Sequence, residues 1–276
     1  MIKAIKKVDT DVLVGTRASF NILISKYHPN DVMTIGMEHM NLQAYPEHYQ
    51  QDILDACRKL DLITTLTKQD QLNYAQHINT PVYTIPNIIR PIKNDTHKEN
   101  IIMSAGRLEF EKGFDILIES IRRIQDDLKR LNFKVEIYGD GQERESLQQL
   151  IDQHHLNDLI TLYAATQQLN TKLAKSKITV VPSRNEGFGM VVLEAMAQDN
   201  IVISFKDTLG PASIITHQVN GYLAHYGDAS SLAKYIDIAM NHIDDADQMV
   251  YEGHVTLKHY TPTTVYETFM SAINSI

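Results

Sequence analysis

The chain has 276 residues, a formal net charge of −8 and one cysteine, Cys57. This length allows one large domain or two modest ones, and an apolar content of 43% is ample for a packed core. The negative charge argues against nucleic acid as a partner, and a single cysteine excludes an intramolecular disulfide and a cysteine-cluster zinc site. No stretch approaches the about 20 apolar residues of a membrane span, and residues 1–11 lack a signal-peptide core. We therefore expect a cytoplasmic protein, with peripheral association at the inner face of the membrane left open.

Short apolar runs alternate with helical patterns over the first third of the chain, which indicates a parallel α/β sheet. The expected strands cover residues 11–15, 31–36, 62–66 and 82–85. The expected helices cover residues 19–27, 46–60 and 68–77.

Residues 88–100 are polar, contain Pro91 and a charged run, and show no apolar periodicity, so we place an interdomain linker there. A second alternating series follows. Its expected strands are 101–105, 134–138, 160–163, 178–181, 201–205 and 221–224, and its expected helices are 114–131, 143–154, 169–174, 190–197 and 230–240. A turn is expected near Gly210-Pro211. A final helix, about 263–275, lies beyond this second sheet, where it can pack back over the first.

The most informative stretch is a strand at 178–181, a loop reading Glu186-Gly187-Phe188-Gly189 and a helix from Met190. Glycines allow a ligand to approach the backbone, and the free N–H groups of a helix start attract an anion. Glu186 and Glu194 can both face a crevice at the carboxyl end of the strand. Taken alone, a pair of this spacing is better explained by a helix cap at Glu186 and a solvated Glu194.

A second loop, from Gly106 to Gly113, places Arg107 and Lys112 between a strand and a helix. A forked guanidinium and a compact ammonium can together neutralise a departing diphosphate. The alternative is a surface loop whose cations pair with Glu109 and Glu111.

The string from Pro182-Ser183 through the Glu-Gly-Phe-Gly loop to Leu193-Glu194-Ala195-Met196-Ala197 resembles the signature of the retaining glycosyltransferases of family 4, the glycosyl transferases group 1. The Gly-Arg and Lys-Gly of the earlier loop fit the same family. The resemblance implies an α/β protein of GT-B fold, in which two Rossmann-like lobes face a cleft. It implies that Glu186 meets the donor sugar, that Glu194 holds the ribose hydroxyls, and that Arg107 and Lys112 bind the donor diphosphate. It also implies substrate binding by the loop and helix start, namely Gly187, Phe188, Gly189, Met190 and Val191.

Three further positions gain a role from the resemblance. Gly139, in a glycine turn after the strand at 134–138, would lie beneath the nucleotide. His39, in a Glu-His pair near the end of a first-lobe strand, would be a catalytic residue that approaches the donor sugar and the acceptor, although a packed histidine is the alternative. Arg17 is an acceptor-side candidate. The family's base pocket usually carries a glycine where this chain has Ala164-Ala165-Thr166, so the base stays open.

The resemblance is strongest over residues 101–239 and weaker over residues 11–89. The family's opening strand and glycine-rich loop have no counterpart before residue 11, so we expect an incomplete first lobe, in a truncated product, a fragment or a short variant completed by a partner. The expected domains are a partial acceptor-side domain at 1–88, a nucleotide-sugar-binding domain at 89–262, and a helix at 263–276 that returns to the first lobe.

The resemblance implies a bacterial hexosyltransferase that moves a sugar from a nucleoside diphosphate donor, probably a UDP-sugar, with retention at the anomeric carbon. Surface glycans, teichoic-type polymers and glycoproteins remain open as acceptors. The histidines show no metal-ligand spacing, so we expect neither a metal nor a cofactor. The alternatives are a non-catalytic glycan- or nucleotide-sugar-binding subunit of a glycosylation complex and, third, a nucleotide-sugar epimerase.

Overall fold

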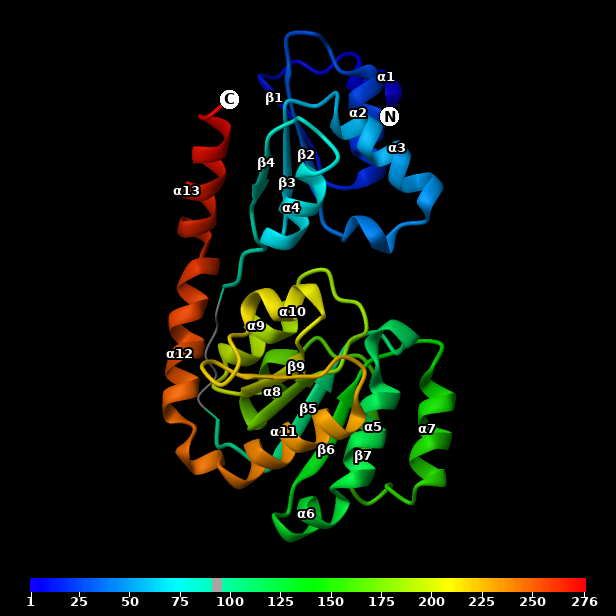
Figure 1. Cartoon of the computed structure of the whole chain (residues 1–276), viewed down its shortest axis with the longest axis vertical. Helices are drawn as coiled ribbons and strands as arrows, with labels where there is room; N and C mark the ends of the chain where they lie inside the picture. The colour runs from blue at the N-terminus through cyan, green and yellow to red at the C-terminus, as the bar shows by residue number, and fades with distance from the viewer. Residues whose placement is uncertain (91–95) are drawn as a thin grey trace. The chain divides into compact units, whose positions relative to one another are not determined.

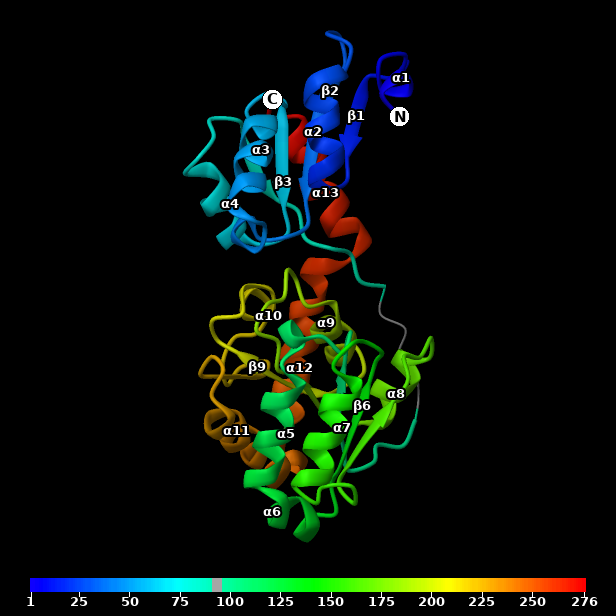
Figure 2. The same cartoon turned by 90° about the vertical axis from the view of Figure 1, so that its right-hand side faces the viewer.

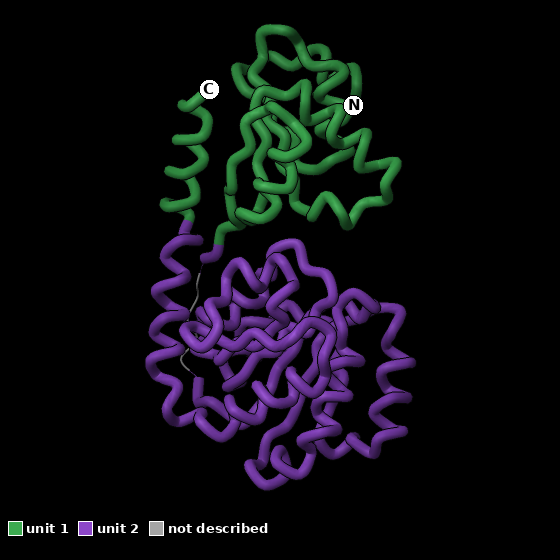
Figure 3. The backbone as a smooth tube through the Cα atoms, viewed as in Figure 1, with its two compact units in different colours: residues 1–88, 262–276 green, residues 89–261 purple. Residues whose placement is uncertain are grey.

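The computed structural model describes residues 1–90 and 96–276, which divide into two compact units (Figure 1, Figure 3). Unit 1 comprises Met1–Ile88 and Pro262–Ile276, and unit 2 comprises Ile89–Thr261. The linker expected at 88–100 includes residues 91–95, which lie outside the described residues. No helix in the described parts of the chain is long and apolar enough to cross a membrane.

Unit 1 contains a four-stranded parallel sheet in the order β1-β2-β3-β4. Its strands are β1 (Val12–Gly15), β2 (Met33–Glu38), β3 (Leu62–Thr65) and β4 (Val82–Thr84). Its helices are α1 (Ile2–Ile5), α2 (Ala18–Tyr27), α3 (Glu47–Cys57), α4 (Lys68–Ala75) and α13 (Pro262–Ile273), with a 3-10 turn at Leu42–Ala44. The four strands match the predicted ones to within two residues at each end, whereas the helix expected at 46–60 is shorter.

The two faces of this sheet are covered by different helices. Ile63 of β3 packs in one apolar cluster with residues of α2, α3 and α4. Its neighbour Leu62 points to the opposite face, as adjacent strand residues do, and there it meets Val265 and Ala272 of α13. The last helix of the chain therefore completes the core of unit 1, and its end is fixed by a 2.7 Å hydrogen bond between Tyr83 Oη and Ser275 Oγ.

Unit 2 contains a six-stranded sheet in the order β10-β9-β8-β5-β6-β7, again with every pairing parallel. Its strands are β5 (Ile101–Ala105), β6 (Lys134–Tyr138), β7 (Ile160–Tyr163), β8 (Ile178–Val181), β9 (Ile201–Phe205) and β10 (Tyr222–Ala224). Its helices are α5 (Phe114–Arg123), α6 (Gln125–Arg130), α7 (Arg144–Gln153), α8 (Leu169–Lys175), α9 (Met190–Met196), α10 (Leu209–Ile214), α11 (Ala229–Asn241) and α12 (Asp247–Leu257). Single 3-10 turns occupy Phe110–Lys112, Ile243–Asp245 and Lys258–Tyr260.

The core of unit 2 lies between the sheet and helices α5, α7 and α11, which Figure 2 shows on one side of the strands. Helices α8 and α9 pack on the other face, against β5, β8 and β9. Strand β8 (Ile178–Val181) is therefore fully buried. Strands buried on both faces have near-continuous apolar sequences, which explains the mostly apolar sequence of β8.

Two predictions for unit 2 were wrong in detail, and one helix was missed. The helix expected at 114–131 is broken at Ile124 (φ −119°, ψ 20°), after which Asp126 and Asp127 provide the acidic first turn that suits a new helix start. The turn expected at Gly210-Pro211 is the first turn of α10, because proline is tolerated where the helix needs no N–H donor. Helix α12 was not predicted.

The strand order places a switch point beside β5. The chain runs from β5 outward through β6 to β7, and then returns to the other side of β5 with β8, β9 and β10. Ligands of open α/β sheets bind where neighbouring loops diverge at such a point, beyond the carboxyl ends of the strands. In this unit that position is flanked by the loops that follow β5 and β8.

Candidate functional site

The loops after β5 and β8 meet through an ion pair. Lys112 Nζ lies 2.6 Å from Glu186 Oε2, and the two side chains are 17% and 22% exposed. The backbone N–H groups of Arg184 and Asn185 also donate to the carbonyl of Glu111, at 2.8 and 3.2 Å. The structure therefore brings together Lys112 and Glu186, two of the residues singled out in the sequence, at the switch point.

This meeting of loops requires glycine at Gly113. Its φ is +67°, and a Cβ atom there would lie 2.1 Å from the carbonyl oxygen of Pro182. The left-handed conformation and the missing side chain let α5 begin directly against the end of β8. Gly113 thus sets the distance between the two loops that carry Lys112 and Glu186.

Arg107 lies on the same loop as Lys112 but has a different partner. Its guanidinium is 71% exposed and lies 3.1 Å from Glu111 Oε1. For Arg107 the structure shows the surface pairing that the sequence left as an alternative, whereas Lys112 pairs with neither Glu109 nor Glu111. Each cation of the expected clamp is held by its own carboxylate.

The glycine loop divides into a buried and an accessible part. Phe188 is 3% exposed, so any contact of this residue with a substrate falls to its backbone. Gly187, Met190 and Val191 are half-buried. Gly189 has a φ of +90° and is the N-cap residue of α9, so the N-cap position offers no side chain to that helix start.

Glu194 lies in α9, on the helix that follows the loop. Burial raises the pKa of its carboxyl group. No hydrogen bond or ion pair joins it to another residue within the described ranges. A half-buried acceptor of this kind suits hydroxyl donors from a ligand, because their hydrogen bonds would offset the cost of its desolvation.

Gly139 lies in a hollow of ≈ 360 Å³ at the ends of β5, β6 and β7, which Arg107 and Asp140 also line. A Cβ at Gly139 would lie 1.9 Å from the carbonyl oxygen of Gly106, so glycine is required for the two strand ends to approach. Asp140 Oδ2 accepts a 3.0 Å hydrogen bond from the backbone of Ala165 in the loop after β7. Three neighbouring loops therefore enclose this hollow.

Sequence reasoning missed Arg184, which holds these loops in place. Its guanidinium donates two hydrogen bonds, of 2.8 and 2.6 Å, to the carboxylate of Asp115 in the first turn of α5. It also stacks 4.0 Å from the ring centroid of Phe110. The only signal in the sequence is its place in the loop after β8, since Asp115 and Phe110 are about 70 residues away along the chain.

Unit 1 has a hollow of its own at the carboxyl ends of β1 and β2, with a volume of ≈ 390 Å³. Arg17 and His39 both line it, so the structure brings together the two candidates from the first half of the chain. Tyr45 and Tyr49 also line it, with their rings edge to face at 5.6 Å, and no motif in the sequence singles them out. Partial burial lowers the pKa of His39, which favours a neutral imidazole.

The residue before this histidine has a different environment from the one expected. Glu38 does not follow β2 but is its last residue, and it is 2% exposed. Burial raises the pKa of its carboxyl group to about 7, against the lowering effect of the hydrogen bond with Asn21. Asn21 Nδ2 donates to Glu38 Oε1 at 2.7 Å. Glu38 therefore lies inside the core beneath the hollow.

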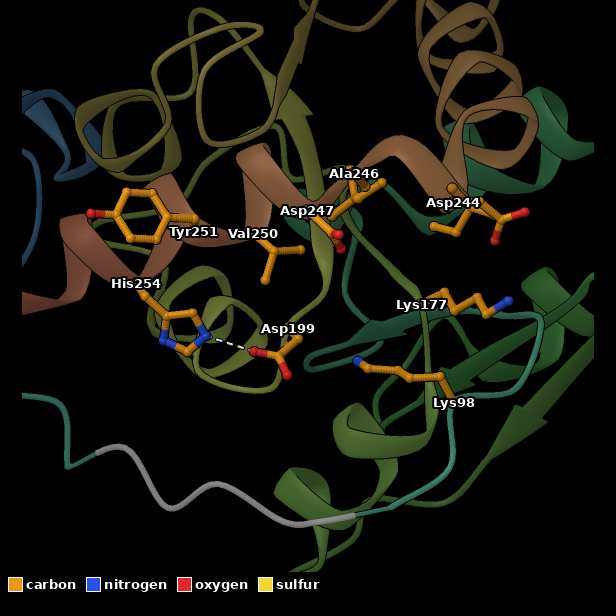
Figure 4. A pocket seen from close by; sticks show the side chains of 11 residues that line it. Lys98, Lys177, Asp199, Asp244, Ala246, Asp247, Val250, Tyr251 and His254 are labelled. Carbon is orange, nitrogen blue, oxygen red and sulfur yellow. Dashed lines mark hydrogen bonds and ion pairs between the residues drawn. The ribbon is translucent and has the colours of Figure 1, made fainter.

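A larger hollow, of ≈ 470 Å³, lies near the amino ends of β8 and β9 in unit 2 and is lined on one side by α12 (Figure 4). Its charged groups serve the fold. Lys98 Nζ donates to the carbonyls of Ser176 and Gln198, just beyond the ends of α8 and α9, where helix dipoles favour a cation. His254 Nε2 lies 2.6 Å from Asp199 Oδ1 and links α12 to the turn between α9 and β9. We assign this hollow no part in the candidate site.

Nowhere in the described ranges do three or more His, Cys, Asp or Glu side chains come together in a way that could hold a metal ion. The positive charge at the switch point comes instead from Lys112 and, at the rim, from Arg107.

Residues 87–255 match the family model described as Glycosyl transferases group 1. The match covers unit 2 almost completely, including the loops after β5, β6 and β8.

Two curated relatives are each 30% identical to the chain. An exopolysaccharide phosphotransferase of Streptomyces coelicolor matches 87% of this chain and 26% of its own length. The GtfA subunit of a UDP-N-acetylglucosamine–peptide N-acetylglucosaminyltransferase of Limosilactobacillus reuteri matches 73% of this chain and 38% of its own length. The chain thus spans between about a quarter and two fifths of these relatives.

Among solved structures, a TarM variant of S. aureus in complex with Fondaparinux, alpha-GlcNAc-glycerol and UDP superposes with a TM-score of 0.87 at 20% identity. It covers 99% of this chain and 58% of its own chain. The likeness at this identity shows the fold, which is that of the GT-B glycosyltransferases.

Proposed function

The chain belongs to the glycosyl transferases group 1 family, and we propose that it transfers a sugar from a UDP-sugar to a hydroxyl group of a glycan, a teichoic-type polymer or a glycoprotein. The observation that carries the proposal is the arrangement at the switch point of unit 2. There the ion pair of Lys112 and Glu186 precedes the start of α9, and α9 carries Glu194, whose carboxylate has no partner among the described residues. The choice of UDP as the nucleotide of the donor is supported by the names of the GtfA relative and of the TarM complex.

In the proposed reaction the leaving group is UDP, and negative charge grows on its diphosphate as the glycosidic bond breaks. Lys112 supplies the nearest cation, Arg107 supplies a second from the rim, and together they stabilise this charge without a metal ion. Glu194 accepts hydrogen bonds from the ribose hydroxyls. Turnover should therefore survive EDTA.

We also propose retention of configuration by a front-face course. Glu186 is engaged by Lys112 at 2.6 Å, and an ammonium-bound carboxylate is a poor nucleophile. His39 and Arg17 line the hollow of unit 1 and are proposed to serve the acceptor side. The leaving phosphate oxygen then helps to take the proton of the acceptor hydroxyl. The anomeric configuration of the product, read by proton NMR, tests this part.

The experiment for the function itself identifies the nucleotide product. The purified chain is incubated with a panel of UDP-sugars that begins with UDP-N-acetylglucosamine, with water or added glycan as the acceptor, and the nucleotides are separated. The proposal predicts UDP. Release of UMP would mean transfer of a sugar phosphate, as the name of the Streptomyces relative suggests, and binding without release would identify a non-catalytic partner subunit.

A further inference from the structure

The backbone passes between the two units twice, after Ile88 and after Thr261. The residues on the unit 2 side of these two crossings are joined to each other. Ile89, which is 5% exposed, donates its N–H to the carbonyl of Tyr260 at 2.9 Å. Tyr260 closes the 3-10 turn Lys258–Tyr260 that follows α12. Both crossings are thus anchored in unit 2 at one point.

The side chain of Tyr260 extends this anchor to the glycine loop. Its ring lies edge to face against the ring of Phe188, with centroids 5.7 Å apart and an interplanar angle of 68°. This is a favoured geometry for aromatic pairs, which makes the contact directional as well as apolar. Phe188 is the one large apolar residue in the loop from Glu186 to Gly189, and it is almost completely buried.

The first turn of α10 supports the loop independently of Tyr260. The N–H of Gly210 donates to the carbonyl of Glu186 at 3.1 Å, and a Cβ at Gly210 would lie 2.6 Å from the backbone of Phe188. Gly189 lies against Pro211 in the same way, because a Cβ there would be 3.2 Å from its ring. The loop therefore has backbone contacts with α10 and a ring contact with Tyr260.

Helix α12 leads directly to Tyr260 and is itself fixed on α9. A Cβ at Gly253 would be 3.5 Å from the side chain of Met196, so the two helices approach closely. Asn220 Nδ2 donates to Thr256 Oγ1 at 2.8 Å. The position of the Tyr260 ring is thus determined by the same unit that carries the loop.

We propose that Tyr260 is a positioning residue of the candidate active site. Through Phe188 its ring fixes the path of the loop, and so the place of the Glu186 carboxylate against Lys112 and of the N–H groups that follow Gly189. The inference rests on the proposed function for its kinetic consequence, but the contact itself can be tested without activity. A displacement of about 1 Å in a catalytic group can lower turnover roughly a hundredfold.

The test compares Tyr260→Ala with Tyr260→Phe and with Tyr222→Ala. Tyr222 is the matched control, since it is a partly buried tyrosine of unit 2 that stacks on Tyr235, at 5.5 Å. The turnover number for UDP release from UDP-N-acetylglucosamine is measured below the melting temperature of every variant. We expect Tyr260→Ala to lose roughly tenfold or more, Tyr260→Phe to keep the wild-type value, and Tyr222→Ala to lose stability without loss of turnover.

Hydrogen exchange of the peptide that spans residues 183–192 gives the second readout. Exchange should be faster in Tyr260→Ala than in Tyr222→Ala and unchanged in Tyr260→Phe. If Tyr260→Ala does not fold, Tyr260→Leu replaces it in both measurements. Equal turnover and equal exchange in the alanine variants would overturn the inference. A wild-type protein without turnover contradicts the proposed function, whereas the exchange comparison still decides the role of Tyr260.

Discussion

Glu186 holds the ammonium of Lys112 in the structure, so a bound diphosphate must compete with this carboxylate for the same cation. We predict that Glu186→Gln binds UDP more tightly than the wild type, roughly three- to tenfold, because the competing negative charge is removed. The same variant should turn over more slowly, since the proposed contact with the donor sugar is weakened. Calorimetric titration with UDP measures the first effect.

Glu119→Gln is the matched control for this substitution. Glu119 also belongs to an ion-paired cluster, with Arg122 and Arg123, but it lies in α5 away from the loops of the site. Its UDP affinity should equal that of the wild type. Weaker binding of UDP by Glu186→Gln would mean that the carboxylate contacts the nucleotide directly and would contradict the competition.

Glu38 makes the stability of the protein depend on pH. Its pKa is about 7 in the folded chain against 4.5 for an ordinary glutamate, so the folded state binds the proton more tightly than the unfolded state does. The free energy of unfolding therefore falls as pH rises from about 4.5 to about 7 and is unaffected by this group outside that window. Glu38→Gln, which keeps an acceptor for Asn21, should be more stable than the wild type at pH 8 by roughly 1–3 kcal/mol.

Urea unfolding at pH 4.5 and pH 8 measures this difference, with the exposed Glu145 changed to Gln as the control. At pH 4.5 the advantage of Glu38→Gln should largely disappear, because the wild-type carboxyl group is then protonated. An equal effect at both pH values would show that the substitution acts through packing and not through the charge.

The junction between the secondary-structure elements β8 and α5 depends on one glycine, Gly113. We predict that Gly113→Ala destabilises the protein by about 1–3 kcal/mol more than Gly227→Ala. Both glycines have a φ of +67°, so both variants incur the left-handed strain, but a Cβ at Gly227 meets nothing within 4 Å whereas one at Gly113 meets the carbonyl of Pro182. Thermal unfolding of the two variants measures the difference, and equal losses would show that the strain alone accounts for the effect.

The strands and most helices were predictable because their signals are local. Apolar runs stopped by Pro182 or Gly106 mark strand ends in any context. Helix α12 was missed because only Gly253 and Leu257 of its residues are buried, which leaves a weak apolar pattern. The helical turn at Gly210 packs against the backbone of Phe188, which lies far away along the chain, whereas the break at Ile124 has a local signal in Asp126 and Asp127.

In the candidate site, too, local motifs were predictable and tertiary contacts were not. Glu186, Lys112 and the glycines stand in linear motifs, so the sequence indicated them. The pairing of Lys112 with Glu186 joins residues 74 positions apart, and the supports from Arg184 and Tyr260 depend equally on tertiary contacts. A sequence pattern can therefore nominate the groups of this site but cannot state which of them touch.

In the molecule as a whole, the family match, the GT-B fold and the switch-point geometry of unit 2 support the proposed transfer of a sugar from a UDP-sugar. The roles proposed for the two units differ, because unit 2 carries the cations and Glu194 while unit 1 carries His39 and Arg17. The proposed reaction requires that Lys112 stabilises the negative charge on the departing UDP.

The turnover number for UDP release by Lys112→Ala, relative to the wild type, tests this requirement most directly. Because the diphosphate is anionic both before and during bond cleavage, the Michaelis constant should rise, but the loss in turnover should be larger. We predict a loss of roughly a hundredfold or more, as for removal of one oxyanion donor, and a smaller loss for Arg107→Ala, whose guanidinium is largely exposed. A Lys112→Ala protein that releases UDP at the wild-type rate would contradict the account.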